Sequence, residues 1–277
     1  MFKFSLCNEV LAGMPFAKQC EAAARMGYQG LEIAPFTLSG SPETLSSREA
    51  ARIRAMVESF GLEVTGLHWL LVKPEGLSLT DPDAALRART LEVMKRITGL
   101  CAELGGRVLV HGSPRQRQIA AGESKGQALA RLQAALSAVA ETAAAHGLTY
   151  CLEPLSAHET PLINTVAEAV ELIRAVDHPG LRTMIDCSAA GLGERESVPE
   201  LMDRWLPTGL IGHIQVNDPN RRGPGQGEMK FAPILAALRR HGYGGAIGVE
   251  PFEYVPDGPG AAAFCMGYLK GVSEGLG

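Results

Sequence analysis

The chain has 277 residues, of which 46% are hydrophobic, enough to build a full core and to exclude an intrinsically disordered protein. Its formal net charge is only −4 and its Lys and Arg residues are scattered, which argues against a nucleic-acid binder with a concentrated basic face. It has no apolar run near the roughly 18–20 residues of a membrane helix, no signal-peptide core in MFKFSLCNEV, and six dispersed cysteines without a CxxC pair, so we expect a globular protein of the reducing cytoplasm.

The chain alternates short β-like runs with longer runs whose apolar residues recur at helical spacing. The predicted strands are 2–6, 30–36, 62–69, 107–112, 148–155, 181–188, 210–218 and 245–252. The predicted helices between and after them include 15–27, 42–61, 82–106, 127–147, 165–180, 230–242 and 260–272. Eight strand-then-helix units in this length favour an α/β fold, a single (β/α)8 TIM barrel over residues 1–277. A doubly wound sheet usually shows a glycine-rich phosphate loop after its first strand, whereas here that strand leads into CNEVLAGMP.

The carboxyl ends of the predicted strands carry polar side chains, and in a TIM barrel the active site lies at that end. Glu153 shares a strand face with Cys151, and Glu250 shares one with Gly248, so small residues line the barrel interior below each acid. Seven of the eight strands end in a side chain that can bind a metal or move a proton, namely Glu32, His68, His111, Glu153, Asp186, Gln215 and Glu250.

Three of these residues, Glu153, Asp186 and Glu250, are acids that would converge at one barrel mouth. Three uncompensated carboxylates within a few ångströms are strongly unfavourable, so raised pKa values, basic side chains or a divalent cation must compensate them. An all-oxygen ligand set favours Mg²⁺ or Mn²⁺ over a soft metal. In the alternative interpretation, each acid is a separate surface or salt-bridged residue.

The seventh predicted strand places His213, Gln215 and Asn217 at alternate positions, so the three polar side chains share one face. That face is expected to point to a polar site rather than to water. His213 lies one inward step deeper in the barrel than Gln215. We therefore expect His213, and also Glu32, to form hydrogen bonds inside the barrel that support the site.

These residues resemble those of the xylose-isomerase-like TIM barrels, the sugar phosphate isomerase and epimerase superfamily, and in particular the ketose 3-epimerases and hydroxypyruvate isomerases. The resemblance extends over nearly the whole chain, and the matching segments are GYQGLEI, LEPLSAHETPLINT, MIDCSAAG, HIQVNDPNRRGPGQGEMKF and GVEPF.

The resemblance implies a divalent-metal-dependent isomerase or epimerase of a small sugar or hydroxy-carbonyl acid. It implies one cation, Mn²⁺ or Mg²⁺, held by Glu153, Asp186, Gln215 and Glu250. It also implies that Glu153 and Glu250 are catalytic: one removes the proton beside the substrate carbonyl to give a cis-enediolate, and the other returns a proton. In the same way Glu159 matches an acid that contacts the substrate near the reacting bond.

The substrate is less well defined, because the chain departs from the ketose 3-epimerases around the pocket. Those enzymes have His where this chain has Ala189, and His at the position of Gln215, whereas hydroxypyruvate isomerases have Gln there. The segment 156–158 reads SAH, where many relatives have Asn-Arg-Tyr. Arg221 matches a residue that contacts the substrate, and the glycine-rich loop around it is expected to bring it over the pocket.

Several further residues have both a functional and a structural interpretation. His68 and His111 are expected to bond to substrate hydroxyls or to the metal ligands, with structural hydrogen bonds as the alternative. Trp69 can form an apolar wall against the sugar carbons or simply pack. Arg115 and Arg117, in the loop after the fourth strand, can bind a phosphate or carboxylate of the substrate, although arginines in exposed loops are more often only solvated.

Three other functions stay open as alternatives. A metal-dependent dehydratase of a keto-sugar or inosose begins with the same proton abstraction. An apurinic-site endonuclease shares the barrel and would use His68 and His111 as zinc ligands, but it needs further histidines that Ala189 and DPNRRGPGQGEMK do not supply. A non-catalytic binding protein has no reason to keep three converging carboxylates. The expected partner is a small molecule, with no nucleic acid or membrane, and a homo-oligomer would be consistent with this type of barrel.

Overall fold

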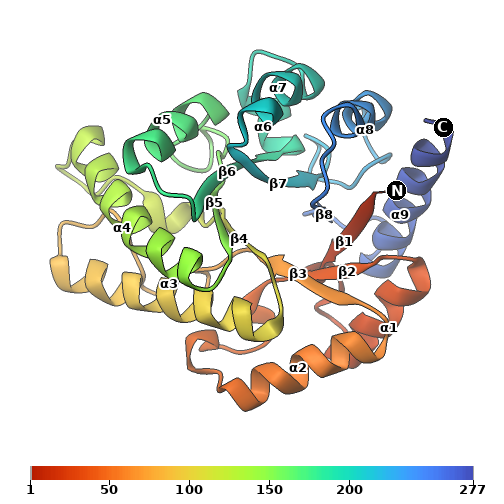
Figure 1. The fold of residues 1–277 in the computed structure, drawn as a ribbon, viewed down its shortest axis with the longest axis horizontal. Helices are drawn as coiled ribbons and strands as arrows, with labels where there is room; N and C mark the ends of the chain where they lie inside the picture. Colours follow the sequence, from red (N-terminus) through yellow and green to blue (C-terminus); the bar gives the residue numbers. More distant parts are fainter. Residues whose placement is uncertain (1, 277) are drawn as a thin grey trace.

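Eight parallel strands close into a barrel in the computed structural model, which describes residues 2–276 (Figure 1). They follow one another around the barrel in chain order, and β8 pairs with β1 to close it. The strands are β1 Lys3–Cys7, β2 Gly30–Ile33, β3 Glu63–Leu67, β4 Val108–His111, β5 Thr149–Leu152, β6 Leu181–Asp186, β7 Ile211–Val216 and β8 Ala246–Val249. The predicted TIM barrel is confirmed, and every strand overlaps its predicted run.

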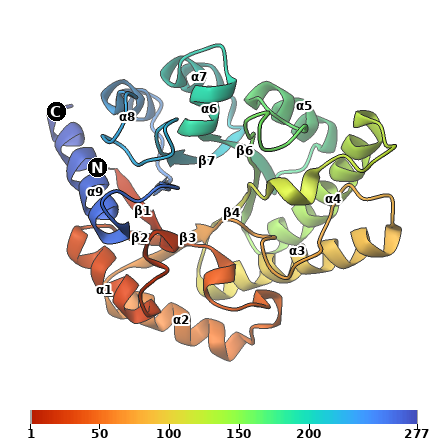
Figure 2. The same ribbon diagram turned by 180° about the vertical axis from the view of Figure 1, so that it is seen from behind.

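Helices form a ring outside the barrel, and seven of them match predicted runs (Figures 1 and 2). Those seven are α1 Phe16–Met26, α2 Ser47–Ser59, α3 Ala84–Leu104, α4 Lys125–Ala145, α5 Val166–Val176, α8 Phe231–Arg240 and α9 Gly258–Gly275. The short helices α6 Cys187–Gly193 and α7 Val198–Trp205 were not predicted. Helix α2 starts later than predicted because Ser46 and Glu49 form a capping box. Within residues 2–276, no helix combines the length and apolar character that crossing a bilayer requires.

The core lies between the strands and the helices, while the barrel interior is narrow. Inside the barrel, Val110, Cys151 and Met184 form a small separate apolar cluster. Glycines make room for the other interior side chains. A Cβ atom on Gly212 would lie 2.8 Å from Cys151 Sγ, and one on Gly248 would lie 2.5 Å from Glu32 Oε2. Both distances are too short for a side chain, so these two positions require glycine.

The strand register sets the heights of the polar side chains at the barrel mouth. Cys7 of β1 is paired with Glu32 of β2, and Asp186 of β6 is paired with Gln215 of β7. His213 is paired with Met184, two residues before Asp186. Because neighbouring residues in register share a level in a parallel sheet, His213 lies one layer deeper than Gln215.

Candidate active site

Three acids meet at the carboxyl ends of β5, β6 and β8. Glu153, Asp186 and Glu250 each offer a carboxylate oxygen within 4.8 Å of the other two. All three residues are buried, with exposed fractions of 6%, 3% and 3%. The structure therefore brings together the acids that strand parity directed inward, and the interpretation of three separate surface acids does not hold.

Ionising all three carboxyl groups together is electrostatically unfavourable unless a cation is bound between them. Burial and the neighbouring Asp186 raise the pKa of Glu153 well above its ordinary value. Burial and the neighbouring Glu153 likewise raise the pKa of Glu250 well above its ordinary value. Burial also raises the pKa of Asp186 to about 6, although the N–H of Ala189 and the amide of Asn217 donate to it and oppose the rise. The cluster is thus suited to bind a positive charge.

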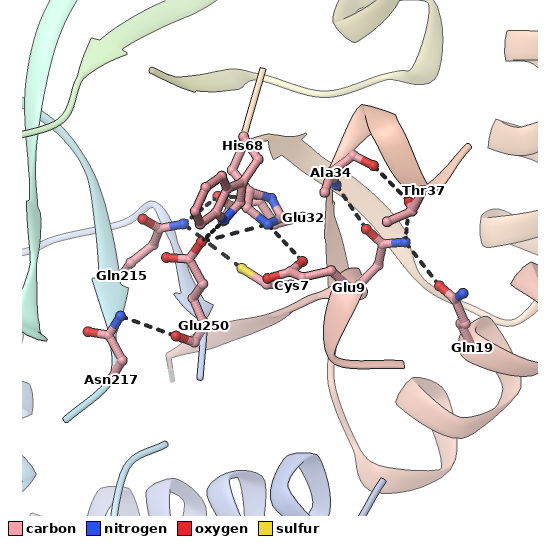
Figure 3. A network of polar contacts seen from close by, with 12 residues as sticks. Cys7, Glu9, Gln19, Glu32, Ala34, Thr37, His68, Gln215, Asn217 and Glu250 are labelled. Carbon is pink, nitrogen blue, oxygen red and sulfur yellow. Dashed lines mark hydrogen bonds and ion pairs between the residues drawn. The ribbon is translucent and has the colours of Figure 1, made fainter. Parts of the chain in front are cut away.

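Gln215 supplies a fourth oxygen at this level of the barrel. Its Nε2 donates to Glu32 Oε1 over 2.9 Å, and because a carboxylate only accepts, this bond fixes which way the amide faces. The other end, Oε1, is buried and has no hydrogen-bond partner. Figure 3 shows the nitrogen turned toward Cys7 and the oxygen turned away from it. A buried oxygen without a donor, on the residue paired with Asp186 across the sheet, fits a metal ligand.

Glu32, which also contacts His213, fixes the orientation of the Gln215 amide. His213 Nε2 lies 2.8 Å from Glu32 Oε2, and both side chains are almost fully buried. Burial by itself would raise the pKa of Glu32, but His213 overcomes that effect and holds the pKa below its ordinary value. Glu32 is therefore an ionised acceptor that orients both neighbours.

Asn217 links two of the acids. Its Nδ2 donates to Asp186 Oδ2 over 2.7 Å. The same Nδ2 donates to the main-chain oxygen of Glu250 over 3.1 Å (Figure 3). Its Oδ1 accepts from the N–H of Ser188 at the start of α6. The N–H of Ala189 donates to Asp186 Oδ1 over 2.7 Å. Ala189, at the position where the family resemblance leads us to expect a histidine, thus positions Asp186 through its backbone.

A second group of side chains lies on the other side of Glu250. Cys7, Glu9, His68 and Glu250 each offer an atom within 4.8 Å of the others. His68 Nε2 lies 2.8 Å from Glu9 Oε2 and 3.8 Å from Glu250 Oε1 (Figure 3). Burial lowers the pKa of His68, but the carboxylates of Glu9 and Glu32 outweigh burial and raise it. The sequence interpretation missed Glu9, although the polar pair Asn8–Glu9 directly after the first strand was a usable signal.

A small cavity is bounded by two of the acids, Glu153 and Glu250. Trp69 Nε1 donates to Glu250 Oε1 over 2.9 Å, and the Trp69 ring meets Phe252 edge to face. Glu159 Oε2 accepts from Ser156 Oγ over 2.9 Å. The wall is formed by His68, Trp69, Val110, Gly112, Glu153, Leu155, Glu159, Glu250 and Phe252. Trp69 and Glu159 therefore lie where the sequence placed them, at a pocket beside the acid cluster.

Gly112 gives Glu153 its place against the end of β4. A Cβ atom on Gly112 would lie 1.7 Å from Glu153 Oε2, so a side chain there would displace the Glu153 carboxylate.

Arg221 is exposed, and its guanidinium lies 4.9 Å from the centre of the Phe252 ring. It adopts a left-handed backbone conformation with φ 71°, and its carbonyl accepts from the N–H groups of Phe252 and Glu253. Arg221 thus lies at the outer margin of the cavity.

The prediction that His111 points into the site is wrong. Val110 faces the barrel interior, so strand alternation turns His111 to the opposite face, where its Nδ1 lies 2.8 Å from the hydroxyl of Tyr150. Burial, helped by the nearby Arg117, lowers the pKa of His111 to about 3. His111 belongs to neither group of candidate ligands found among residues 2–276, which removes one of the zinc ligands that the endonuclease alternative needs.

Arg117 also differs from the expectation of a solvated loop arginine. It is fully buried at the end of the short helix η4 Pro114–Arg117, whereas Arg115 of the same segment is exposed. Burial lowers the pKa of Arg117 to about 10, and Glu153 and Glu159 oppose that change. The guanidinium therefore keeps its charge at neutral pH.

The raised pKa values predict how the metal-free protein responds to pH. A carboxyl group whose pKa is higher in the folded state contributes stability at low pH and loses that contribution as the pH rises through the folded-state value. Because the pKa of Asp186 rises from its ordinary value of 3.8 to about 6 in the folded protein, the melting temperature in EDTA is expected to fall as the pH rises from about 4 to about 6.5. The titration of His68 changes stability in the same direction, so the test compares wild type with Asp186→Asn. The variant should show a shallower slope by differential scanning calorimetry, and equal slopes would contradict the assignment.

Comparison with known proteins gives the family of this chain. The sequence profile described as xylose isomerase-like TIM barrel matches residues 20–269. The chain belongs to this family. Over 234 residues it is 29% identical to a D-psicose 3-epimerase of Ruminiclostridium cellulolyticum, covering 84% of this chain and 76% of the relative. Over 128 residues it is 34% identical to a 2-oxo-tetronate isomerase of Pectobacterium atrosepticum, covering 44% of this chain and 48% of the relative.

Solved structures agree on the fold of this xylose isomerase-like barrel. The structure of an L-ribulose 3-epimerase superposes with a TM-score of 0.83 at 21% identity, covering 99% of this chain and 95% of the other. The superfamily recognised from the strand-end motifs is thereby confirmed, as is the prediction of an enzyme of the sugar isomerase and epimerase type.

Proposed function

We propose that this xylose isomerase-like barrel is a divalent-metal-dependent 3-epimerase of small ketoses, in which Glu153 and Glu250 move the proton. The observation that carries the proposal is the meeting of two buried carboxyl groups, one from β5 and one from β8, on the wall of one cavity. Inverting a carbon requires one group that takes a proton and a second that delivers one from the other face. The D-psicose 3-epimerase among the relatives supports the same reaction.

The proposed ligands of the ion are Glu153, Asp186, Gln215 and Glu250. They fit a hard divalent cation because all four donors are oxygens, three of them anionic, and because Gln215 Oε1 lacks any other partner. When bound, Mn²⁺ or Mg²⁺ supplies positive charge that stabilises the negative charge developing on the substrate carbonyl oxygen.

The protein orients its two proton-transfer groups before the substrate arrives. Trp69 holds one oxygen of Glu250, and the missing side chain at Gly112 lets Glu153 lie close to β4. Trp69 and Phe252 provide apolar surface for the carbon chain of the sugar, and Glu159 provides an acceptor for a hydroxyl. Such preorganisation lowers the barrier because the reacting groups need little rearrangement.

A second candidate is an aldose–ketose isomerase acting on a small hydroxy-carbonyl acid. Two points favour it: Gln215 matches the residue that the resemblance to hydroxypyruvate isomerases implies, and the chain is 34% identical to the 2-oxo-tetronate isomerase over 128 residues. In this reaction the proton is removed and returned on one face, so one glutamate would carry most of the transfer.

Deuterium uptake from solvent distinguishes these reactions. The protein, loaded with Mn²⁺ or Mg²⁺, is incubated in D2O with D-psicose, D-fructose, L-ribulose, hydroxypyruvate and an inosose. We expect a ketose to gain deuterium at C3 and to appear as its 3-epimer by NMR. An aldehyde product from hydroxypyruvate would support the isomerase instead, and loss of water from the inosose would support the dehydratase. Absence of C3 exchange in every ketose would refute the epimerase proposal.

A further inference from the structure

Arg117 carries a buried charge that none of the roles assigned so far explains. The residue is fully buried, and its Nε, Nη1 and Nη2 all lack hydrogen-bond partners. A cation removed from water without hydrogen bonds is strongly unfavourable unless nearby charges compensate it. We therefore expect this guanidinium to interact electrostatically with the charged groups around it.

The surroundings of the guanidinium include two acids of the active site. The charged and titratable groups that act on it are Glu153, Glu159 and Tyr150, and the guanidinium in turn acts on His111. Glu153 and Glu159 both line the cavity, whereas Arg117 does not. The guanidinium thus acts on these two acids without forming part of the cavity wall.

The backbone around Arg117 is held in place from two sides. Thr160 Oγ1 donates to the carbonyl of Arg117 over 3.2 Å, and Gln118 Nε2 donates to the carbonyl of Glu159 over 2.9 Å. The N–H of Leu79 donates to the carbonyl of Gln116 over 2.8 Å. The helix η4 is therefore fastened both to the loop that carries Glu159 and to the loop after β3.

We propose that Arg117 is a positioning residue whose fixed positive charge, buried without hydrogen-bond partners, balances the negative charge of Glu153 and Glu159 at the cavity wall. Three ligand carboxylates carry one negative charge more than a divalent ion neutralises, and the buried Arg117 supplies the missing positive charge from outside the cavity wall. The inference rests on the proposed function, since it takes the cluster to bind a divalent ion and Glu153 to move a proton.

The test compares Arg117→Met, which removes the charge, with Arg117→Lys, which keeps it, and with Arg115→Met as an exposed control from the same segment. Mn²⁺ affinity is measured by electron paramagnetic resonance titration, without substrate, in the pH range where the affinity no longer increases with pH, so that the ligand acids are ionised in every variant. Because like charges repel, Arg117→Met is expected to bind Mn²⁺ about threefold more tightly or better. With saturating Mn²⁺ and the ketose found active, its kcat should fall about a hundredfold while KM changes little. Arg117→Lys and Arg115→Met should resemble wild type in both measurements.

A purely structural role of Arg117 predicts a different pattern, in which Lys and Met impair the protein equally and Mn²⁺ affinity falls in both. That pattern would overturn the proposal, as would wild-type kcat in Arg117→Met. If Arg117→Met does not fold, Arg117→Gln replaces it, and Arg117→Lys alone still refutes the proposal if its kcat is as low as that of the neutral variant. The Mn²⁺ measurement needs no substrate, so it tests Arg117 even if wild type epimerises none of the ketoses.

Discussion

Glu250→Gln is expected to lower kcat by at least about a thousandfold while leaving the fold intact, because an amide cannot take up and return a proton. The substitution keeps the shape of the side chain, and the amide oxygen can still accept from Trp69 Nε1. Glu153→Gln should have an effect of similar size. In a two-base reaction each variant blocks proton removal from one of the two epimers, so the two variants should lose C3 deuterium exchange with opposite epimers.

The control for these variants is Glu253→Gln, an exposed glutamate three residues after Glu250. It should keep wild-type activity. All variants are compared by circular dichroism and by melting temperature, to separate loss of chemistry from loss of fold. Full activity in either Glu153→Gln or Glu250→Gln would rule out the assignment of these residues as the proton-transfer pair.

Gln215→Ala is expected to weaken Mn²⁺ binding by at least about tenfold, since even residues that only orient metal ligands contribute that much to affinity. The variant removes the one neutral oxygen of the proposed ligand set and also frees Glu32 Oε1 from its amide donor. Binding is measured by isothermal titration in the absence of substrate. Gln133→Ala on the outer helix α4 serves as the control and should bind Mn²⁺ like wild type. An unchanged Mn²⁺ affinity in Gln215→Ala would disprove the ligand assignment.

Much of the site followed from strand periodicity, because a period of two determines which side chains share a face. That rule placed Glu153, Asp186 and Glu250 at one mouth. In β4 the same rule only separates Val110 from His111, because both faces of this strand carry aliphatic residues, and it is the structure that turns Val110 to the interior. The prediction failed there because it rested on the polar character of His111, which parity could not test.

Other residues could not be placed by periodicity. Glu9 lies in the short helix η1 Asn8–Leu11, where strand alternation no longer applies. Arg117 is in a loop segment, and its burial depends on contacts with the segments around Leu79 and Thr160, which are distant in sequence. Local sequence predicts exposure for such an arginine, and only the packing of several loops over it reverses that expectation.

The pairing of β1 with β8 has a consequence for how the enzyme is made on the ribosome. Phe4 is paired with Ile247, and Cys7 and Glu9 lie beside Glu250, so the first and last parts of the barrel complete each other. Contacts between segments so far apart in the chain form late, because a long loop must close first. Nascent chains that stop before β8 would have an open sheet edge and lack Glu250. Metal loading and activity are therefore expected only after nearly the whole chain has been synthesised.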